Sequence, residues 1–292
     1  MKKRIVAGMM AILMALGTLT GCGSAQASAA DGASGSSAQR TVEDIREAGV
    51  LKVGAKSDTL NIGMIDTSTG EYKGYEIDLA YEIAASIFDC TAEEAKKNGL
   101  VEFTSVTAKT RGGLLDNGEL DCVIAAFTIT EERKKSWDFT QQYRLEPVTF
   151  LVRKDSGATT LADMDGFIIG VGQGTTTADL IKEYAAEKNI DANYEIQDFQ
   201  YITDGVAALK TGQIDAYSVD RSALVSYVDD TLMLTEDAFG VQEIGIALKK
   251  GNDELTSYMD DVITDLKESG RLDEMKKEWG VMTDSEVEAA MQ

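Results

Sequence analysis

Histidine is absent from the 292 residues, and cysteine occurs only three times. The lack of histidine excludes a Ser-His-Asp triad, a Cys-His nucleophile pair and a histidine-ligated metal site. Three cysteines are too few for a disulfide framework. Cys122 falls within an apolar run, so we expect a buried thiol there, although a bridge between Cys90 and Cys122 stays open.

Positive charge is also scarce. The chain has 28 Lys and Arg against 50 Asp and Glu, a formal net charge of −22. This balance argues against nucleic-acid binding, which requires a basic surface. It also repels small anions at long range, so an anionic ligand would need a locally positive pocket.

Long apolar runs are missing except at the very beginning. Three basic residues precede a short apolar stretch, 5–19, that ends in Leu19-Thr20-Gly21-Cys22. The stretch is too short to cross a bilayer, so we interpret residues 1–21 as a signal peptide. The ending is similar to a bacterial lipobox, which implies cleavage before Cys22 and lipidation of that cysteine. An ordinary cleavage site with an incidental cysteine is the alternative.

Residues 22–40 are nearly all Gly, Ser and Ala after the cysteine. Such a composition gives a flexible tether with an r.m.s. span of roughly 25 Å. We therefore expect a folded body outside the cytoplasm, anchored to the cell membrane by lipid at Cys22.

The remaining chain alternates strand and helix patterns. Residues 50–55 predict a strand, 74–88 an amphipathic helix, 110–118 a short helix and 119–127 a second strand. A similar series follows at 167–174, 175–189 and 205–220. The segments "LLDNGELD" and "ALKTGQID" share Leu-x-x-Gly-x-(Leu/Ile)-Asp, so helix, glycine and strand recur at the same spacing. The pattern predicts two similar α/β lobes with mostly parallel sheets.

Ligands of such sheets bind at the carboxyl ends of the strands. Those ends are predicted at 126–130 in the first lobe and at Asp220 in the second. The region 253–280 predicts long helices that pack back on a lobe, and 283–292 is expected to be a loose tail.

Several blocks together resemble the extracellular solute-binding proteins, family 3, of polar amino-acid ABC transporters. They are "LKVGAKSD", "GYEIDLAYEIA", "LLDNGELDCVIAAFTITEERKKSWDFTQQY", "IGVGQGTTT", "ALKTGQIDAYSVD" and the closing "KKEWG". The resemblance implies the two-lobed periplasmic-binding-protein fold, type II, with two hinge strands and the ligand in the cleft between the lobes. It implies a first lobe of residues 41–145 and 241–282, and a second lobe of residues 146–240.

The stretch "TITEERKK" carries the sharpest signal within these blocks. If Thr130 caps a helix, Arg133 sits in its first turn, where the helix dipole disfavours a cation. The resemblance implies that Arg133 grips the α-carboxylate of a free amino acid, which would resolve that conflict. A guanidinium matches a carboxylate in bidentate fashion. The alternative is a surface arginine paired with Glu131 or Glu132.

The resemblance also assigns the rest of the head-group site, which is the set of residues that bind the α-carboxylate and the α-ammonium of the amino acid. It implies that the hydroxyl and backbone of Thr128 contact the α-carboxylate, and that the Ala126 carbonyl contacts the α-ammonium. Thr175 and Thr176 would add hydroxyl and N–H donors from the second lobe, although plain helix capping explains them too. Asp220 would pair with the α-ammonium; a solvated loop carboxylate is its alternative.

Arg111 and Lys56 indicate which side chain the ligand carries. Their context is most like the aspartate- and glutamate-binding subgroup, in which both would meet the side-chain carboxylate, with Tyr201 as a further phenol donor. The alternatives are surface charges for Arg111 and Lys56, and core packing for Tyr201. Around "TLNIGM" the aromatic and proline of many relatives are missing, which leaves glutamine open as the ligand.

The resemblance therefore implies the substrate-binding component of an ABC importer, binding L-glutamate or L-aspartate without turnover and without a cofactor or metal. Its partner would be an ABC permease, and a monomer is the family default. A dehydratase on the same fold is the enzymatic alternative, but no unassigned carboxylate stands out as a general acid. A lipoprotein that signals to a receptor domain is a third possibility.

Overall fold

The computed structural model describes residues 39–291, which belong to one compact unit. The expected signal peptide, Cys22 and the linker up to residue 38 lie outside the described residues. Arg40, at the end of the expected linker, is instead tied to the folded body, because its Nη1 lies 2.9 Å from Asp121 Oδ2. Across residues 39–291, no helix combines the length and the apolar character that a membrane span requires.

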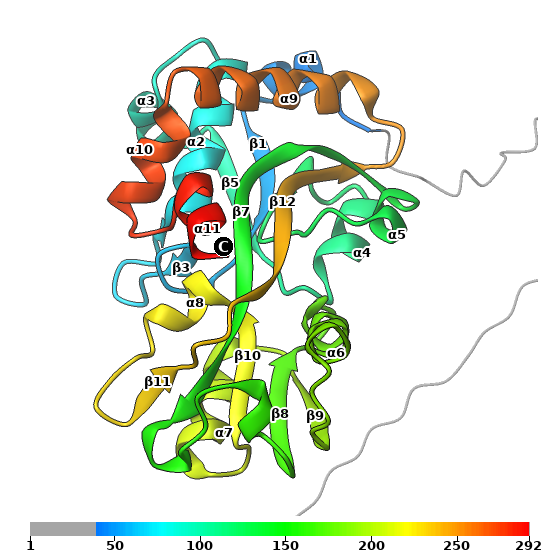
Figure 1. The fold of residues 1–292 in the computed structure, drawn as a ribbon. Coiled ribbons are helices and arrows are strands. Elements are labelled where there is room, and N and C mark those ends of the chain that lie inside the picture. The colour runs from blue at the N-terminus through cyan, green and yellow to red at the C-terminus, as the bar shows by residue number, and fades with distance from the viewer. Residues whose placement is uncertain (1–38, 292) are drawn as a thin grey trace, which may run out of the picture. The chain divides into compact units, whose positions relative to one another are not determined.

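Lobe 1 is built on a parallel three-strand arrangement in the order β5-β1-β6 (Figure 1). Its main elements are α1 (Val42–Ala48), β1 (Leu51–Ala55), α2 (Tyr75–Ile87), α3 (Ala92–Lys97), β5 (Val101–Ser105), α4 (Arg111–Asp116), β6 (Cys122–Ile124) and α5 (Glu131–Lys134). A small second sheet consists of β2 (Asp58–Thr59), β3 (Gly63–Ile65) and β4 (Tyr72–Lys73). Helix α2 packs through fully buried aliphatic residues at helical spacing, as predicted.

Two long antiparallel strands connect the lobes, and we call them the hinge strands. They are β7 (Trp137–Arg153) and β12 (Phe239–Lys249). Both extend from one lobe into the other, so a single sheet runs through the body in the order β5-β1-β6-β12-β7-β10-β8-β9 (Figure 1). The register between them shifts between Phe239 and Gln242, and such irregularities let strands bend.

Lobe 2 contains the parallel strands β10-β8-β9. Its elements are two short 3₁₀ turns (Lys154–Ser156 and Leu161–Asp163), β8 (Phe167–Gly172), α6 (Thr177–Lys188), β9 (Tyr194–Phe199), α7 (Ile202–Thr211), β10 (Ala216–Asp220), α8 (Arg221–Val225) and β11 (Leu232–Leu234). The predicted repeat is confirmed. Gly118 and Gly212 both follow a helix with a left-handed φ, of 71° and 73°, and a strand begins shortly after each.

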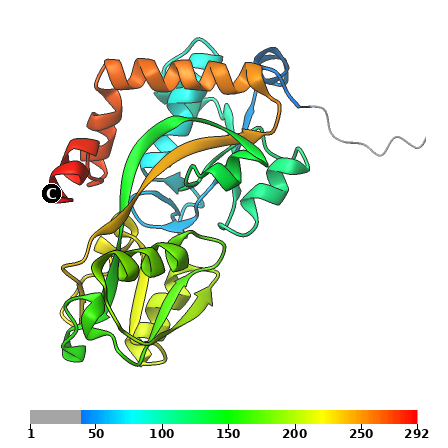
Figure 2. The ribbon, with the colours of Figure 1, turned by 45° about the vertical axis from the view of Figure 1, so that its right-hand side comes forward.

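The C-terminal helices return to lobe 1 (Figure 2). Residues of α9 (Asp253–Glu268) and α10 (Arg271–Glu278), including Met259 and Met275, share one apolar core with Leu79 and Ile83 of α2. This confirms the expectation that the helical stretch packs back on a lobe.

The tail expected to be loose at 283–292 is instead helical up to residue 290. Thr283 caps α11 (Asp284–Ala290) with a reciprocal capping box. Asp284 Oδ1 accepts the Leu145 N–H of β7 at 3.0 Å, and Val287 is fully buried. The expectation of a loose tail was wrong because it weighed composition and overlooked the Thr-x-x-Glu capping signal.

Cys122 is fully buried, as expected, and Cys90 is partly buried. Both are free thiols in the structure, so the bridge left open by the sequence is not present. Burial raises the pKa of the Cys122 thiol well above its ordinary value.

Candidate functional site: a cleft between the lobes

A cavity of about 70 Å³ lies between the two lobes at the hinge strands. Its lining comes from lobe 1, from the hinge strands and from lobe 2. Among the residues that line it are six of the predicted site residues: Lys56, Arg111, Ala126, Thr128, Thr175 and Asp220. The cavity is small, so the structure represents the lobes closed around a space for a small molecule.

Arg111, the first residue of α4, is a buried cation without a counter-ion. It is 3% exposed, and its Nη1 donates to the backbone oxygens of Ala125 at 2.6 Å and Ala126 at 3.0 Å. Its Nε is buried without a partner, and its guanidinium carbon lies 3.8 Å from the Phe127 ring centroid. Within residues 39–291, no carboxylate forms an ion pair with it. Burial, and next the nearby charge of Arg133, lower the pKa of Arg111 to about 9.

Arg133 lies in α5, whose first turn is capped as predicted, since the Thr130 hydroxyl accepts the Arg133 N–H at 3.1 Å. The guanidinium turns back and joins the lobes. Its Nη1 donates to Thr128 O at 2.9 Å, and its Nη2 donates to Gly174 O of lobe 2 at 3.3 Å. It lies 5.1 Å from the Phe127 ring, so Phe127 contacts both guanidiniums.

The surface pairing considered for Arg133 does not occur. Glu131 pairs with Lys134 at 2.8 Å, and Glu132 pairs with Lys135. No described carboxylate forms an ion pair with Arg133, whose pKa is lowered by burial. Arg133 itself stands beside the cavity and is not among the residues that line it.

Two of the three predicted threonines and Asp220 form hydrogen bonds with one residue, Gln242, that the sequence did not indicate. Gln242 of β12 accepts the hydroxyls of Thr128 at 2.8 Å and Thr176 at 2.5 Å on its Oε1. Its Nε2 donates to Asp220 Oδ1 at 3.1 Å. Each hydroxyl has one proton, and in the structure both protons are directed to Gln242 Oε1. The contact of Thr128 with a carboxylate and the donor role of Thr176 stay predictions.

Thr175 lines the cavity directly before α6, at the position that was expected. Its hydroxyl donates to Gly172 O at 2.7 Å, so its proton too is used within the protein. Thr176 caps α6 without a side-chain hydrogen bond to the helix, and it is not among the lining residues. Thr176 thus occupies the N-cap position of α6, but a side-chain capping hydrogen bond does not account for its hydroxyl.

Two residues expected at the ligand side chain behave differently. Lys56 lines the cavity, but its Nζ lies 2.8 Å from Asp58 Oδ1 with both side chains largely buried. Its charge is therefore already compensated. Tyr201 does not line the cavity: it is 40% exposed, and its hydroxyl accepts from Gln200. The neighbouring Gln200 lines the cavity in its place.

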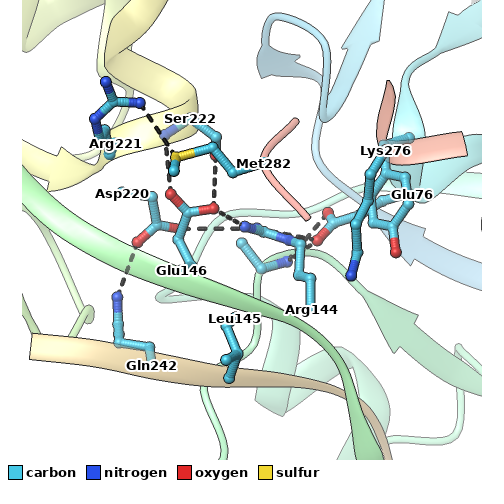
Figure 3. A network of polar contacts seen from close by, with 12 residues as sticks. Glu76, Arg144, Leu145, Glu146, Asp220, Arg221, Ser222, Gln242, Lys276 and Met282 are labelled. Carbon is cyan, nitrogen blue, oxygen red and sulfur yellow. Dashed lines mark hydrogen bonds and ion pairs between the residues drawn. The ribbon is translucent and has the colours of Figure 1, made fainter. Parts of the chain in front are cut away.

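A buried cluster of charges reaches the cavity through Arg144 and Asp220, and it was missed from the sequence (Figure 3). Figure 3 shows Arg144 of β7 between Glu146 and Glu76. Its Nη1 contacts Glu146, and its Nη2 lies 3.5 Å from Glu76 and 3.8 Å from Asp220 Oδ2. Ser222 N donates to Glu146 at 2.9 Å. The cluster thus connects lobe 1, a hinge strand and lobe 2.

Glu76 links the same cluster to the lobe 1 loop of the cleft. Its carboxylate accepts the Ala126 N–H at 2.9 Å and the Tyr143 hydroxyl at 2.6 Å. Ala126 has a φ of 49°, which is unusual for a residue with a side chain. The contacts of Glu76 and Arg111 with this peptide hold the strained conformation in place.

One sequence signal could have revealed this charge cluster. Arg144 and Glu146 alternate in a strand that is otherwise largely apolar around them. Charged residues two apart on one face of a buried strand must be paired. Glu76, among aliphatic residues of α2, carried the same signal.

Comparisons with known proteins agree with this architecture. A family model described as bacterial extracellular solute-binding proteins, family 3, matches residues 51–282. The ABC transporter glutamine-binding protein GlnH of Bacillus subtilis (strain 168) is 32% identical over 280 residues, covering 95% of this chain and 97% of that relative. A glutamine-binding protein of Geobacillus stearothermophilus is 33% identical over 246 residues, covering 82% and 89%.

Among solved structures, the P235GK mutant of ArgBP from T. maritima superposes with a TM-score of 0.68 at 26% identity, covering 82% of this chain and 98% of that one. The fold, the closed cleft and these similarities point to one conclusion. The chain belongs to the bacterial extracellular solute-binding proteins, family 3, and is an amino-acid-binding protein of the ABC-transporter type.

Proposed function

We propose that this protein captures an acidic amino acid, L-glutamate or L-aspartate, and delivers it to an ABC permease. The observation that carries the proposal is the pair of guanidiniums, Arg111 and Arg133, that flank Phe127 without any carboxylate partner in the described chain. Two cations without an ion-pair partner beside one cavity suit a ligand with two carboxylates. An acidic amino acid supplies two carboxylates, whereas a neutral one supplies a single carboxylate.

The two cations have distinct roles in this proposal. Arg133 takes the α-carboxylate at the edge of the cleft, where it already joins lobe 1 to lobe 2 through Thr128 and Gly174. Arg111 takes the side-chain carboxylate inside the cavity, where its Nε has no protein partner. Burial of that carboxylate without a cation would carry a large desolvation cost. Lys56 contributes less than expected, because Asp58 already compensates it.

A group of oxygen acceptors at the cavity suits the α-ammonium. Three oxygen acceptors, Ala126 O, Thr128 Oγ1 and Asp220 Oδ2, belong to residues that line the cavity. The proton of the Thr128 hydroxyl is directed to Gln242, which leaves the hydroxyl oxygen as an acceptor. An ammonium group has three N–H donors, so three acceptors can satisfy it. In this arrangement Thr128 contacts the ammonium by its hydroxyl, where the sequence predicted the carboxylate.

Glutamine is the second candidate. Two relatives that match along most of the chain are named for glutamine. Gln173 and Gln200 also line the cavity and can form paired hydrogen bonds with a carboxamide. Glutamine would, however, leave Arg111 buried without a negative partner.

The remaining features of the proposal concern the setting of the protein. Binding is reversible and without turnover, as the solute-binding family implies. The family sets the protein outside the cytoplasm. Lipidation at Cys22, which lies outside the described residues, would hold it at the membrane, and it would act as a monomer.

Isothermal titration calorimetry with L-glutamate, L-aspartate, L-glutamine and L-arginine tests the proposal. We expect L-glutamate or L-aspartate to bind at least tenfold more tightly than L-glutamine. L-Arginine serves as the control, because its cationic side chain would face Arg111. Tighter binding of L-glutamine would contradict the acidic-ligand proposal.

A further inference from the structure

We propose that Gln242 is a positioning residue that fixes the donor and acceptor pattern of the head-group site. The inference rests on the proposed function, because it concerns the subsite for the α-ammonium. Gln242 lies on hinge strand β12, is 4% exposed and lines the cavity. Its side chain joins Thr128 of lobe 1 to Thr176 and Asp220 of lobe 2.

The orientation of the carboxamide follows from chemistry. An ionised carboxylate can only accept hydrogen bonds, so the NH₂ end of Gln242 must face Asp220. The carbonyl end then faces the hydroxyls of Thr128 and Thr176. A carbonyl can only accept, and therefore both hydroxyls must donate to it. One contact, 3.1 Å between Nε2 and Asp220 Oδ1, thus determines the direction of the whole network.

The direction of these hydrogen bonds determines which donors and acceptors remain for the ligand. Thr128 can offer its hydroxyl oxygen only as an acceptor, and Asp220 Oδ1 is held so that Oδ2 remains for the ligand and for Arg144 at 3.8 Å. Together with Ala126 O, these oxygens give the subsite three acceptors. Such a site favours an ammonium over a hydroxyl or a carboxylate. Gln242 creates this selectivity without needing to contact the ammonium itself.

The same contacts couple the head-group site to closure of the two lobes. Oε1 accepts one hydroxyl from each lobe, at 2.8 and 2.5 Å, and this arrangement exists only while Thr128 and Thr176 stand close together. The register shift between Phe239 and Gln242, and the left-handed φ of 55° at Gly240, lie directly before Gln242. The residue therefore sits where the hinge strand changes course.

A double-mutant cycle on the full-length protein tests the role. The variants are Gln242→Leu, Thr128→Val and the double variant, with Thr128→Ser as a control that keeps the hydroxyl. Calorimetry gives the Kd for L-glutamate, L-glutamine and glutarate, which lacks the ammonium. Thermal unfolding of each ligand-free variant reports its folding separately.

We expect Gln242→Leu to weaken both amino acids by about tenfold to a hundredfold, the range for hydrogen bonds that involve charged groups. The two amino acids share a head group, so their affinity ratio should change by less than about threefold. In the Thr128→Val background the same substitution should cost less than it does in the wild type, because the Thr128 acceptor is already lost and only the contact of Gln242 with Asp220 remains to be removed. Binding of glutarate, where measurable, should be unchanged.

Wild-type affinity in Gln242→Leu would overturn the inference, as would a full additional loss in the Thr128→Val background. A preference of the wild type for L-glutamine would instead count against the acidic ligand proposed above. The cycle would then be run with L-glutamine and would still decide the role of Gln242.

Discussion

Substitution of Arg111 by glutamine is the clearest test of whether the protein binds an acidic or a neutral amino acid. The variant keeps a polar side chain near the oxygens of Ala125 and Ala126 but removes the charge. In the proposed complex it leaves a buried carboxylate without its cation. Loss of one partner from a buried charge pair costs about 2–5 kcal/mol, or roughly 30- to 5000-fold in Kd for L-glutamate.

L-Glutamine should respond much less to the same substitution. Its side chain is neutral, so it loses about 1–2 kcal/mol of hydrogen bonding at most. We therefore expect the ratio of the two affinities to move toward L-glutamine by at least about tenfold. Calorimetry on the wild type and on Arg111→Gln measures this ratio directly.

The stability of the ligand-free variant gives an independent check. Arg111 is a buried cation without a counter-ion, and its removal relieves a desolvation cost of several kcal/mol. The loss of its stacking on Phe127 at 3.8 Å costs about 0.5–2 kcal/mol in return. We expect the ligand-free variant to unfold at the same temperature as the wild type or higher. Equal losses of affinity for both ligands, with a lowered Tm, would refute the reasoning.

Four further results are expected. Arg133→Ala should weaken L-glutamate and L-glutamine alike by about 3–5 kcal/mol, and near-wild-type affinity by calorimetry would remove Arg133 from the head-group site. Burial lowers the pKa of Arg111 to about 9, and a bound carboxylate should raise it. The affinity for L-glutamate should therefore fall as the pH rises through 9. The same titration of Arg111→Gln controls for deprotonation of the ligand's own ammonium. Asp284→Ala should destabilise the protein by about 2–4 kcal/mol in urea unfolding, because Asp284 pairs with the buried Lys276 at 2.7 Å; Glu288→Ala, on the same helix, should have little effect. Cys22→Ala should release the protein from the membrane fraction, and retention there would exclude a lipid anchor.

Periodicity was sufficient to predict most of the architecture. The apolar spacing in α2 and the repeated helix, glycine and strand around Gly118 and Gly212 are local signals, and local propensity agrees with the tertiary fold there. Helix α11 was missed because its seven residues are mostly polar on all but one face. Only its capping box and the buried Val287 indicated that it docks.

The site could be predicted in part for a similar reason. Arg111, Ala126, Thr128 and Asp220 follow strands or begin helices at the cleft, and the structure brings them together at one cavity. Gln242 could not be predicted, because its role depends on hydrogen bonds to residues more than twenty positions away in the chain. Long-range pairing of this kind leaves no local pattern in the sequence.

A crystal structure with L-glutamate bound tests the central claim most directly. The account predicts the α-carboxylate within hydrogen-bond distance of the Arg133 guanidinium and the side-chain carboxylate within that distance of Arg111. The ammonium should lie among Ala126 O, Thr128 Oγ1 and Asp220. A bound amino acid that leaves both guanidiniums on their backbone carbonyls, without contact to either carboxylate, would contradict it.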